Sequence, residues 1–208
     1  MGLKGIRWGV TLVALLVART ATAGPFLVSV DTRALQGMAG YIAFDFVAGS
    51  VPTGNSASVR SFTTDGSLTT SKSSGDVRGN LLPGPLSLGS TQFFNEWLQQ
   101  VGAFGSTIGF ELDLGDAAVP GARADQFSFF LLDPNQIPID TSDPSGAGAL
   151  FAIDLTGPAA APAVFSAASA SASVSPLTRG LPEPSSALLM LVAFAGLAAL
   201  NLRRIRRE

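Results

Sequence analysis

Residues 107–114 have the sequence Thr-Ile-Gly-Phe-Glu-Leu-Asp-Leu, in which apolar and polar positions alternate. The apolar side chains from Ile108 to Leu114 fall on one side of an extended chain, and those of Glu111 and Asp113 fall on the other. Alternation with a period of two is typical of a β-strand that buries one face and exposes the other. We therefore expect this stretch to form a half-buried strand of an antiparallel sheet.

The same period recurs on both sides of this segment. In residues 41–46 (YIAFDF), the isoleucine and both phenylalanines share one face, and Asp45 lies on the other. Residues 127–132 (FSFFLL) are apolar on both faces, as a central strand is. Further strands are expected where short apolar runs lie between Gly, Pro, Asn and Asp clusters, at residues 26–30, 58–62, 86–88, 126–132 and 150–155.

Only residues 91–101 (TQFFNEWLQQV) have apolar side chains at helical spacing, so we expect one short helix there. Its apolar stripe consists of Phe94, Trp97, Leu98 and Val101. Seven or so strands, one helix and no regular alternation of strands with helices predict a mainly β chain. The expected fold is an antiparallel β-sandwich or jelly roll, formed as a single domain by residues 24–158.

The composition excludes several classes of chemistry. The 208 residues include no His and no Cys, which removes Ser-His-Asp and Cys-His nucleophiles, His/Cys zinc and haem sites, and disulfides. Carboxylate, hydroxyl and lysine chemistry remain. Residues 24–180 include thirteen acidic and only six basic residues, a balance that opposes binding to nucleic-acid phosphates. We expect no cofactor and no nucleic-acid partner.

The N-terminus has the three parts of a signal peptide. Two basic residues precede an apolar run at residues 8–18, and Ala21-Thr22-Ala23 follows as a cleavage site between small residues. Residues 1–23 are therefore predicted to direct export through the general secretion machinery, with cleavage after Ala23.

The C-terminus carries a second apolar segment. Residues 185–202 (SSALLMLVAFAGLAALNL) contain no charge, and as an α-helix they would extend about 27 Å, enough to cross a thin membrane. The arginines that follow are costly to translocate and would remain in the cytoplasm, so the body of the chain would lie outside. They are Arg203, Arg204, Arg206 and Arg207.

Leu181-Pro182-Glu183-Pro184 stands directly before this apolar segment. A Pro-Glu-Pro triplet, an apolar helix and a terminal arginine cluster, in this order, resemble the PEP-CTERM sorting signal of exported Gram-negative proteins. The resemblance covers residues 181–208, and Leu181 stands where that family most often has Val. It implies that the chain is a substrate of exosortase, a membrane-embedded enzyme that removes the helix.

The resemblance also predicts where the chain goes. It would be anchored transiently in the inner membrane by the C-terminal helix and would then reach the cell surface or the extracellular space. In the exopolysaccharide matrix that the resemblance implies, we expect a structural or adhesive role and no enzymatic activity. The alternatives are a carbohydrate-binding module, a carboxylate hydrolase, and a single-pass protein that the helix anchors permanently.

Residues 159–180 separate the body from the sorting signal and are rich in Ala, Ser and Pro. A last strand around residues 163–165 is one possibility. The Ser/Ala alternation beyond it offers no bulky side chain to bury, so we expect a flexible stalk that exposes the Pro-Glu-Pro triplet to its processing enzyme.

Two carboxylate motifs are candidate sites. Glu111 and Asp113 share a strand face about 7 Å apart, which suits a glycosidase pair, although such carboxylates are usually solvated surface. The loop from Asp133 to Asp143 offers oxygen ligands that calcium accepts. Its alternative is turn chemistry, in which Asp and Asn bond to nearby backbone N–H groups.

Two further motifs have structural alternatives. Trp97 with Phe93 or Tyr41 would make a stacking platform for sugar rings, or would belong to the core. Ser71 beside Lys72 suggests a Ser-Lys hydrolase, but a flexible Ser-rich loop explains the pair better. We therefore assign no catalytic residue and no metal ligand.

Overall fold

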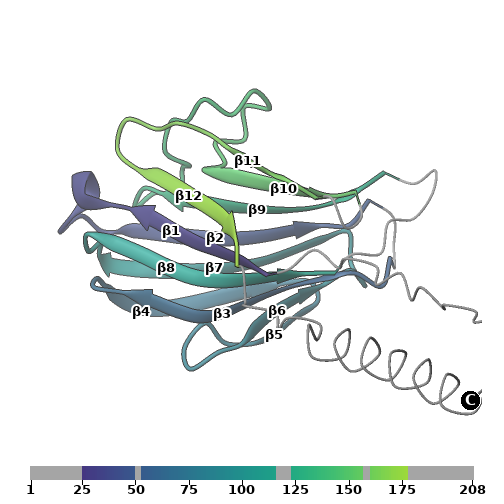
Figure 1. Ribbon diagram of the computed structural model, residues 1–208. Helices are drawn as coiled ribbons and strands as arrows, with labels where there is room; N and C mark the ends of the chain where they lie inside the picture. Colours follow the sequence, from purple (N-terminus) through teal and green to yellow (C-terminus); the bar gives the residue numbers. More distant parts are fainter. Residues whose placement is uncertain (1–24, 50–52, 116–122, 157–159, 178–208) are drawn as a thin grey trace, which may run out of the picture.

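A computed structural model describes residues 25–49, 53–115, 123–156 and 160–177. Within these ranges the chain forms twelve β-strands and one 3-10 helix, η1 (Figure 1). The elements, in chain order, are β1 (Phe26–Asp31), η1 (Arg33–Leu35), β2 (Gly40–Val47), β3 (Ser56–Thr64), β4 (Ser67–Ser74), β5 (Val77–Gly79), β6 (Leu86–Gly89), β7 (Phe94–Ala103), β8 (Thr107–Leu114), β9 (Asp125–Leu132), β10 (Phe151–Leu155), β11 (Pro162–Val164) and β12 (Ser171–Pro176).

The strands form two six-stranded sheets, and their neighbouring strands pair antiparallel. The first sheet has the order β12-β1-β8-β3-β6-β5, and the second has the order β11-β10-β9-β2-β7-β4. The apolar faces of the two sheets share one core, so the expected mainly β fold of packed antiparallel sheets is confirmed. The predicted strand at residues 107–114 is β8.

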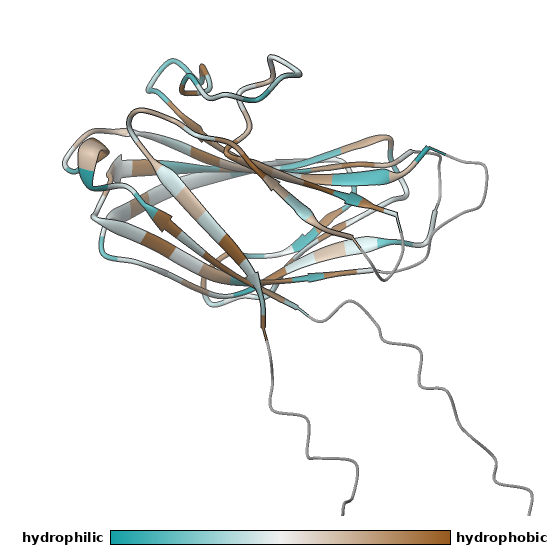
Figure 2. Cartoon of the chain, turned by 45° about the horizontal axis from the view of Figure 1, so that its top comes forward, coloured by the Kyte–Doolittle hydropathy of each residue, from teal (hydrophilic) through white to brown (hydrophobic). Residues whose placement is uncertain are grey.

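Phenylalanine rings from both sheets meet at the centre of this core. Phe44 of β2 and Phe110 of β8 lie with ring centroids 5.4 Å apart in an edge-to-face arrangement across the two sheets. Phe129 and Phe151 stack within the second sheet at 5.5 Å. Apolar and polar segments alternate along several strands (Figure 2), because a strand with one face in the core buries every second side chain, as β1 and β8 do.

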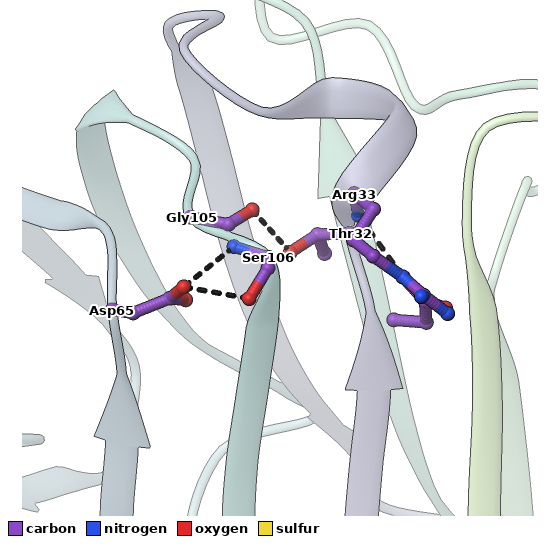
Figure 3. A network of polar contacts seen from close by, with 6 residues as sticks. Thr32, Arg33, Asp65, Gly105 and Ser106 are labelled. Carbon is purple, nitrogen blue, oxygen red and sulfur yellow. Dashed lines mark hydrogen bonds and ion pairs between the residues drawn. The ribbon is translucent and has the colours of Figure 1, made fainter.

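Three connections that cross between the sheets are tied together at one end of the sandwich (Figure 3). Asp65, between β3 and β4, accepts hydrogen bonds from the backbone N–H of Ser106 at 3.0 Å and from its hydroxyl at 2.6 Å. The Thr32 hydroxyl donates to the Gly105 carbonyl at 2.9 Å. The bonds from Ser106 and Thr107 lower the pKa of Asp65 to about 2.

The helix predicted at residues 91–101 is wrong, because residues 94–101 belong to strand β7 and residues 91–93 precede it. The helical stripe of apolar residues is interleaved with Asn95 and Gln99, which point into the sandwich beside Trp97. These amides are satisfied: the Asn95 side chain donates to the Phe46 carbonyl at 3.1 Å, and that of Gln99 donates to the Thr70 carbonyl at 3.0 Å. Because two of the buried positions of β7 are polar, the residue types along this strand do not show the period of two.

The flexible stalk predicted at residues 159–180 is also wrong over most of its length. Residues 162–164 form β11, which corresponds to the strand considered around residues 163–165, and residues 171–176 form β12 at the edge of the first sheet. Edge pairing uses backbone hydrogen bonds and needs no bulky side chains, so small Ser and Ala residues suffice. The body therefore runs to Pro176 rather than ending at residue 158.

Other predictions fall outside the described residues. These are the signal peptide at residues 1–23, the triplet and arginine cluster within residues 181–208, and the apolar segment at residues 185–202. Within the described ranges, no helix is long and apolar enough to span a membrane.

Candidate functional site

The predicted carboxylate pair lies on the outer face of the first sheet. Asp113 accepts a hydrogen bond from the Arg60 guanidinium at 2.9 Å, and both side chains are substantially exposed. Glu111 is the register partner of Arg60 on β3. Neither carboxylate lines the groove described below.

The aspartates at the two ends of the predicted calcium loop bond to their own loop. Asp133 accepts hydrogen bonds from the backbone N–H groups of Asn135 and Ile137, at 2.8 and 2.9 Å. Asp143 accepts from the backbone of Ser145 at 2.9 Å and from that of Ala149 at 3.1 Å. These are the side-chain-to-backbone hydrogen bonds with which Asp residues stabilise turns. Among the described residues, no three acidic side chains gather where they could hold a metal ion.

The predicted stacking platform does not form. Trp97 belongs to the core with only 6% of its surface exposed, whereas Tyr41 lies on the outer face of β2. Phe93 is 59% exposed in the connection before β7. Trp97 and Tyr41 are separated because they lie on opposite faces of the second sheet, and Phe93 lies outside the strands.

Ser71 and Lys72 lie in β4, an exposed edge strand, so the flexible loop proposed for them is wrong. Ser71 pairs with Gln99 and Lys72 with Leu98, and these partners point to opposite faces of β7. Ser71 and Lys72 therefore also point to opposite faces, which leaves the lysine on the outer side of the second sheet.

A groove of about 410 Å³ lies on the outer face of the second sheet, and we call it the outer groove. Its floor consists of Asp45 and Val47 of β2, Gln126, Ser128 and Phe130 of β9, and Ala152 and Asp154 of β10. One wall comes from residues 143–149 of the β9–β10 loop, which covers residues 133–150 and projects above β10 and β11 in Figure 1. The other wall comes from residues 161–165.

The β9–β10 loop is held in place by polar contacts within the loop and with Ser166, which follows β11. Besides the Asp143 bonds, the Ser142 N–H donates to the Ser166 carbonyl at 2.8 Å, and the Ser166 N–H donates to the Ser142 hydroxyl at 2.9 Å. Burial opposes ionisation of Asp143, but the bonds from Ser145 and Ala149 outweigh it and lower its pKa. The wall of the outer groove is therefore built before any ligand arrives.

Asp45 has the most perturbed carboxyl group in the groove. Its strand partners are Ser128 on β9 and Glu96 on β7, and its Oδ1 is buried without a hydrogen-bond partner. Burial, helped by the negative charge of Glu96, raises the pKa of Asp45 to about 7, and burial also raises the pKa of Glu96. Such a group beside a groove marks a candidate site.

Asp45 was not among the residues singled out from the sequence. The alternation in residues 41–46 placed it on the polar face of its strand, and such a face is usually solvated. Its raised pKa depends on Glu96 and on burial by elements remote in the chain. The only sequence signal was a lone acid between apolar neighbours.

Asp125 is a second buried carboxylate that the sequence did not reveal. It accepts hydrogen bonds from the Gly49 N–H at 2.7 Å, the Thr53 hydroxyl at 2.6 Å and the Asn55 amide at 2.9 Å. These donors belong to the connection between β2 and β3. Asp125 therefore has a structural role in holding this crossing between the sheets.

Comparison with known proteins returns nothing similar: no family model, no curated protein and no solved structure matches the chain.

Proposed function

We propose that the chain is an exported, exosortase-processed protein of the cell surface or extracellular matrix, with a structural or adhesive role associated with exopolysaccharide. The observation that carries this proposal is the three-part order at residues 181–208. The triplet comes first, the charge-free segment follows, and the arginines end the sequence. On this proposal the β-sandwich is flanked by a signal peptide and a membrane helix.

The position of the two ends of the body supports this proposal. Phe26 at the start of β1 pairs with Pro176 at the end of β12, and the Leu177 N–H donates to the Pro25 carbonyl at 2.6 Å. The described chain therefore starts and ends at the same end of the sandwich, at Pro25 and Leu177. This arrangement suits a body that the membrane holds at a single pole.

The test follows the full chain in an exporting host with and without exosortase. The triple variant Pro182→Ala, Glu183→Ala, Pro184→Ala should stay at full length in the membrane of the exosortase-positive host, whereas the parent should be shortened and released. Leu181→Val is the matched control, because it introduces the residue commonest in the resembling signal. Immunoblots of membrane and medium fractions measure both outcomes.

Normal release of the triple variant would contradict the sorting proposal. A parent that stays at full length in the membrane despite exosortase would favour the permanently anchored single-pass protein. Recovery of an exported chain that begins at Met1 would contradict the predicted signal peptide.

A carbohydrate-binding module is the second candidate function. The outer groove favours it, since a preformed groove with few polar groups among apolar ones is typical of small-ligand sites. In this candidate the outer groove, and not a platform of Trp97 with Phe93 or Tyr41, would hold the sugar.

A further inference from the structure

The outer groove has the size and construction of a ligand site. Its volume of about 410 Å³ lies within the range of roughly 300–1,000 Å³ that small-molecule sites occupy. The floor is a paired sheet, and one wall is fixed by the Asp143 and Ser142 contacts. A ligand would therefore meet a surface that needs little ordering on binding.

The polar groups of the groove are not equally available. The Gln126 amide donates to Asp154 at 2.8 Å, and Asp143 is occupied by its own loop. Asp45 lines the groove and is partly exposed, although its Oδ1 is buried without a partner. Its neighbour Ser128 reaches the Gln126 oxygen only at 3.5 Å. Asp45 and Ser128 are therefore the adjacent groups best placed to bond to a ligand.

The charges around the groove disfavour anionic ligands. Among the described residues, the lining includes Asp45, Asp143 and Asp154 but no Lys or Arg, so an anion such as a uronate would be repelled. A cation would have to compete for Asp143 and Asp154 with the hydrogen bonds that these side chains already accept. Burial keeps Asp45 protonated below about pH 7. An uncharged ligand that offers hydroxyl groups fits these conditions.

Apart from Ser145, which bonds to Asp143, apolar side chains form the rest of the lining. Phe130 and Phe165 contribute rings, and Ala152 and Ala163 are register partners on β10 and β11 that leave room above the sheet. Apolar surface of this kind packs against the C–H faces of a sugar ring, while hydroxyl groups at its edge reach polar side chains.

We propose that the outer groove binds a sugar unit of a neutral polysaccharide, with the Asp45 carboxyl group and the Ser128 hydroxyl bonding to its hydroxyl groups. This inference deepens the carbohydrate-binding candidate and rests on it. The sugar would contact the outer face of the second sheet. The groove would select polysaccharides that carry no charge.

The test is affinity electrophoresis of the full-length chain in native gels that contain dextran, mannan, galactan or the polyuronate alginate. A polyoxyethylene detergent keeps the chain soluble without adding a competing sugar head group. We expect at least one neutral polymer to retard the chain and alginate to leave it unretarded. Ala147→Trp, at an exposed wall position, should weaken binding about tenfold or more by filling the groove. Ala34→Trp, in η1 and outside the groove, is the matched control.

Substitutions of Asp45 test the floor separately. Asp45→Ala should weaken binding about tenfold, because a ligand hydroxyl loses its partner. Asp45→Asn keeps a donor and an acceptor and should bind within about twofold of the parent below pH 7. Far-ultraviolet circular dichroism checks that each variant is folded. If Asp45→Ala does not fold, Ala147→Trp still decides the question.

Three outcomes would overturn the proposal: no retardation by any of the neutral polymers, equal retardation by alginate, or unchanged binding by Ala147→Trp. Capture of polylysine in place of the neutral polymers would identify the groove as a site for basic peptides instead. None of these outcomes bears on sorting, which the triplet variant tests through the location of the chain.

Discussion

Replacing Asp45 with Asn should remove a pH-dependent loss of stability. The pKa of Asp45 is about 7 in the folded chain against an ordinary value of 3.8, so the folded chain holds this proton more tightly than the unfolded chain does. Stability from this group is fully present below pH 3.8 and falls as the pH rises to about 7. Three pH units at about 1.4 kcal/mol each correspond to a loss of about 4 kcal/mol.

Other charged groups near Asp45 set the background of this measurement. Glu96 on β7 has a pKa raised by burial, so its ionisation weakens the fold in the same direction. Asp143 and Asp154 face the groove from the loop and from β10, and Lys72 lies on the outer side of β4. In the Asp45→Asn variant, the decrease in stability between about pH 4 and pH 7 should therefore be much smaller than in the parent, but not zero.

Urea denaturation of the mature chain at pH 5 and pH 8 provides the assay. Trp97 is the only tryptophan after residue 23 and lies in the core, so its fluorescence reports unfolding. We expect the parent to be less stable at pH 8 than at pH 5 and Asp45→Asn to show a much smaller difference. Asp154→Asn removes a charge from the same face and is the matched control. An equal decline in the parent and in Asp45→Asn would refute the reasoning.

Two further predictions concern polar contacts that join the sheets. Asp125→Ala leaves the donors of Gly49, Thr53 and Asn55 without their acceptor, so it should lower the free energy of unfolding by about 3 kcal/mol. Urea denaturation measures this change, and a loss below about 1 kcal/mol would show that the bonds contribute little. Asp65 has a pKa of about 2, so its stabilising effect is present above pH 3.8 and is lost as the pH falls to about 2. In Asp65→Asn, the loss of stability between pH 3.8 and about 2 should be smaller than in the parent, as measured by circular dichroism during acid unfolding. Identical unfolding curves for the parent and the variant would contradict a stabilising role of the Asp65 carboxylate.

Two of the strands that the sequence predicted most directly are those in which apolar and polar residues alternate with burial. β8 and β2 carry their apolar residues on the face that meets the other sheet, so a period of two is visible in the residue types. β7 was missed because buried Asn95 and Gln99 interrupt the pattern. β4 was missed because an exposed edge strand of Ser and Thr needs only backbone pairing.

The sequence by itself determined the class of fold, the exclusion of His and Cys chemistry, and the order of the signals predicted at the two ends. These conclusions need only local patterns and composition, because alternation and charge are properties of a single segment. Only the tertiary structure decided that Asp45 lies beside Glu96 at the outer groove, that Trp97 points inward, and that Pro25 meets Leu177. These relations join residues far apart in the chain, and they depend on the order in which strands pair within each sheet.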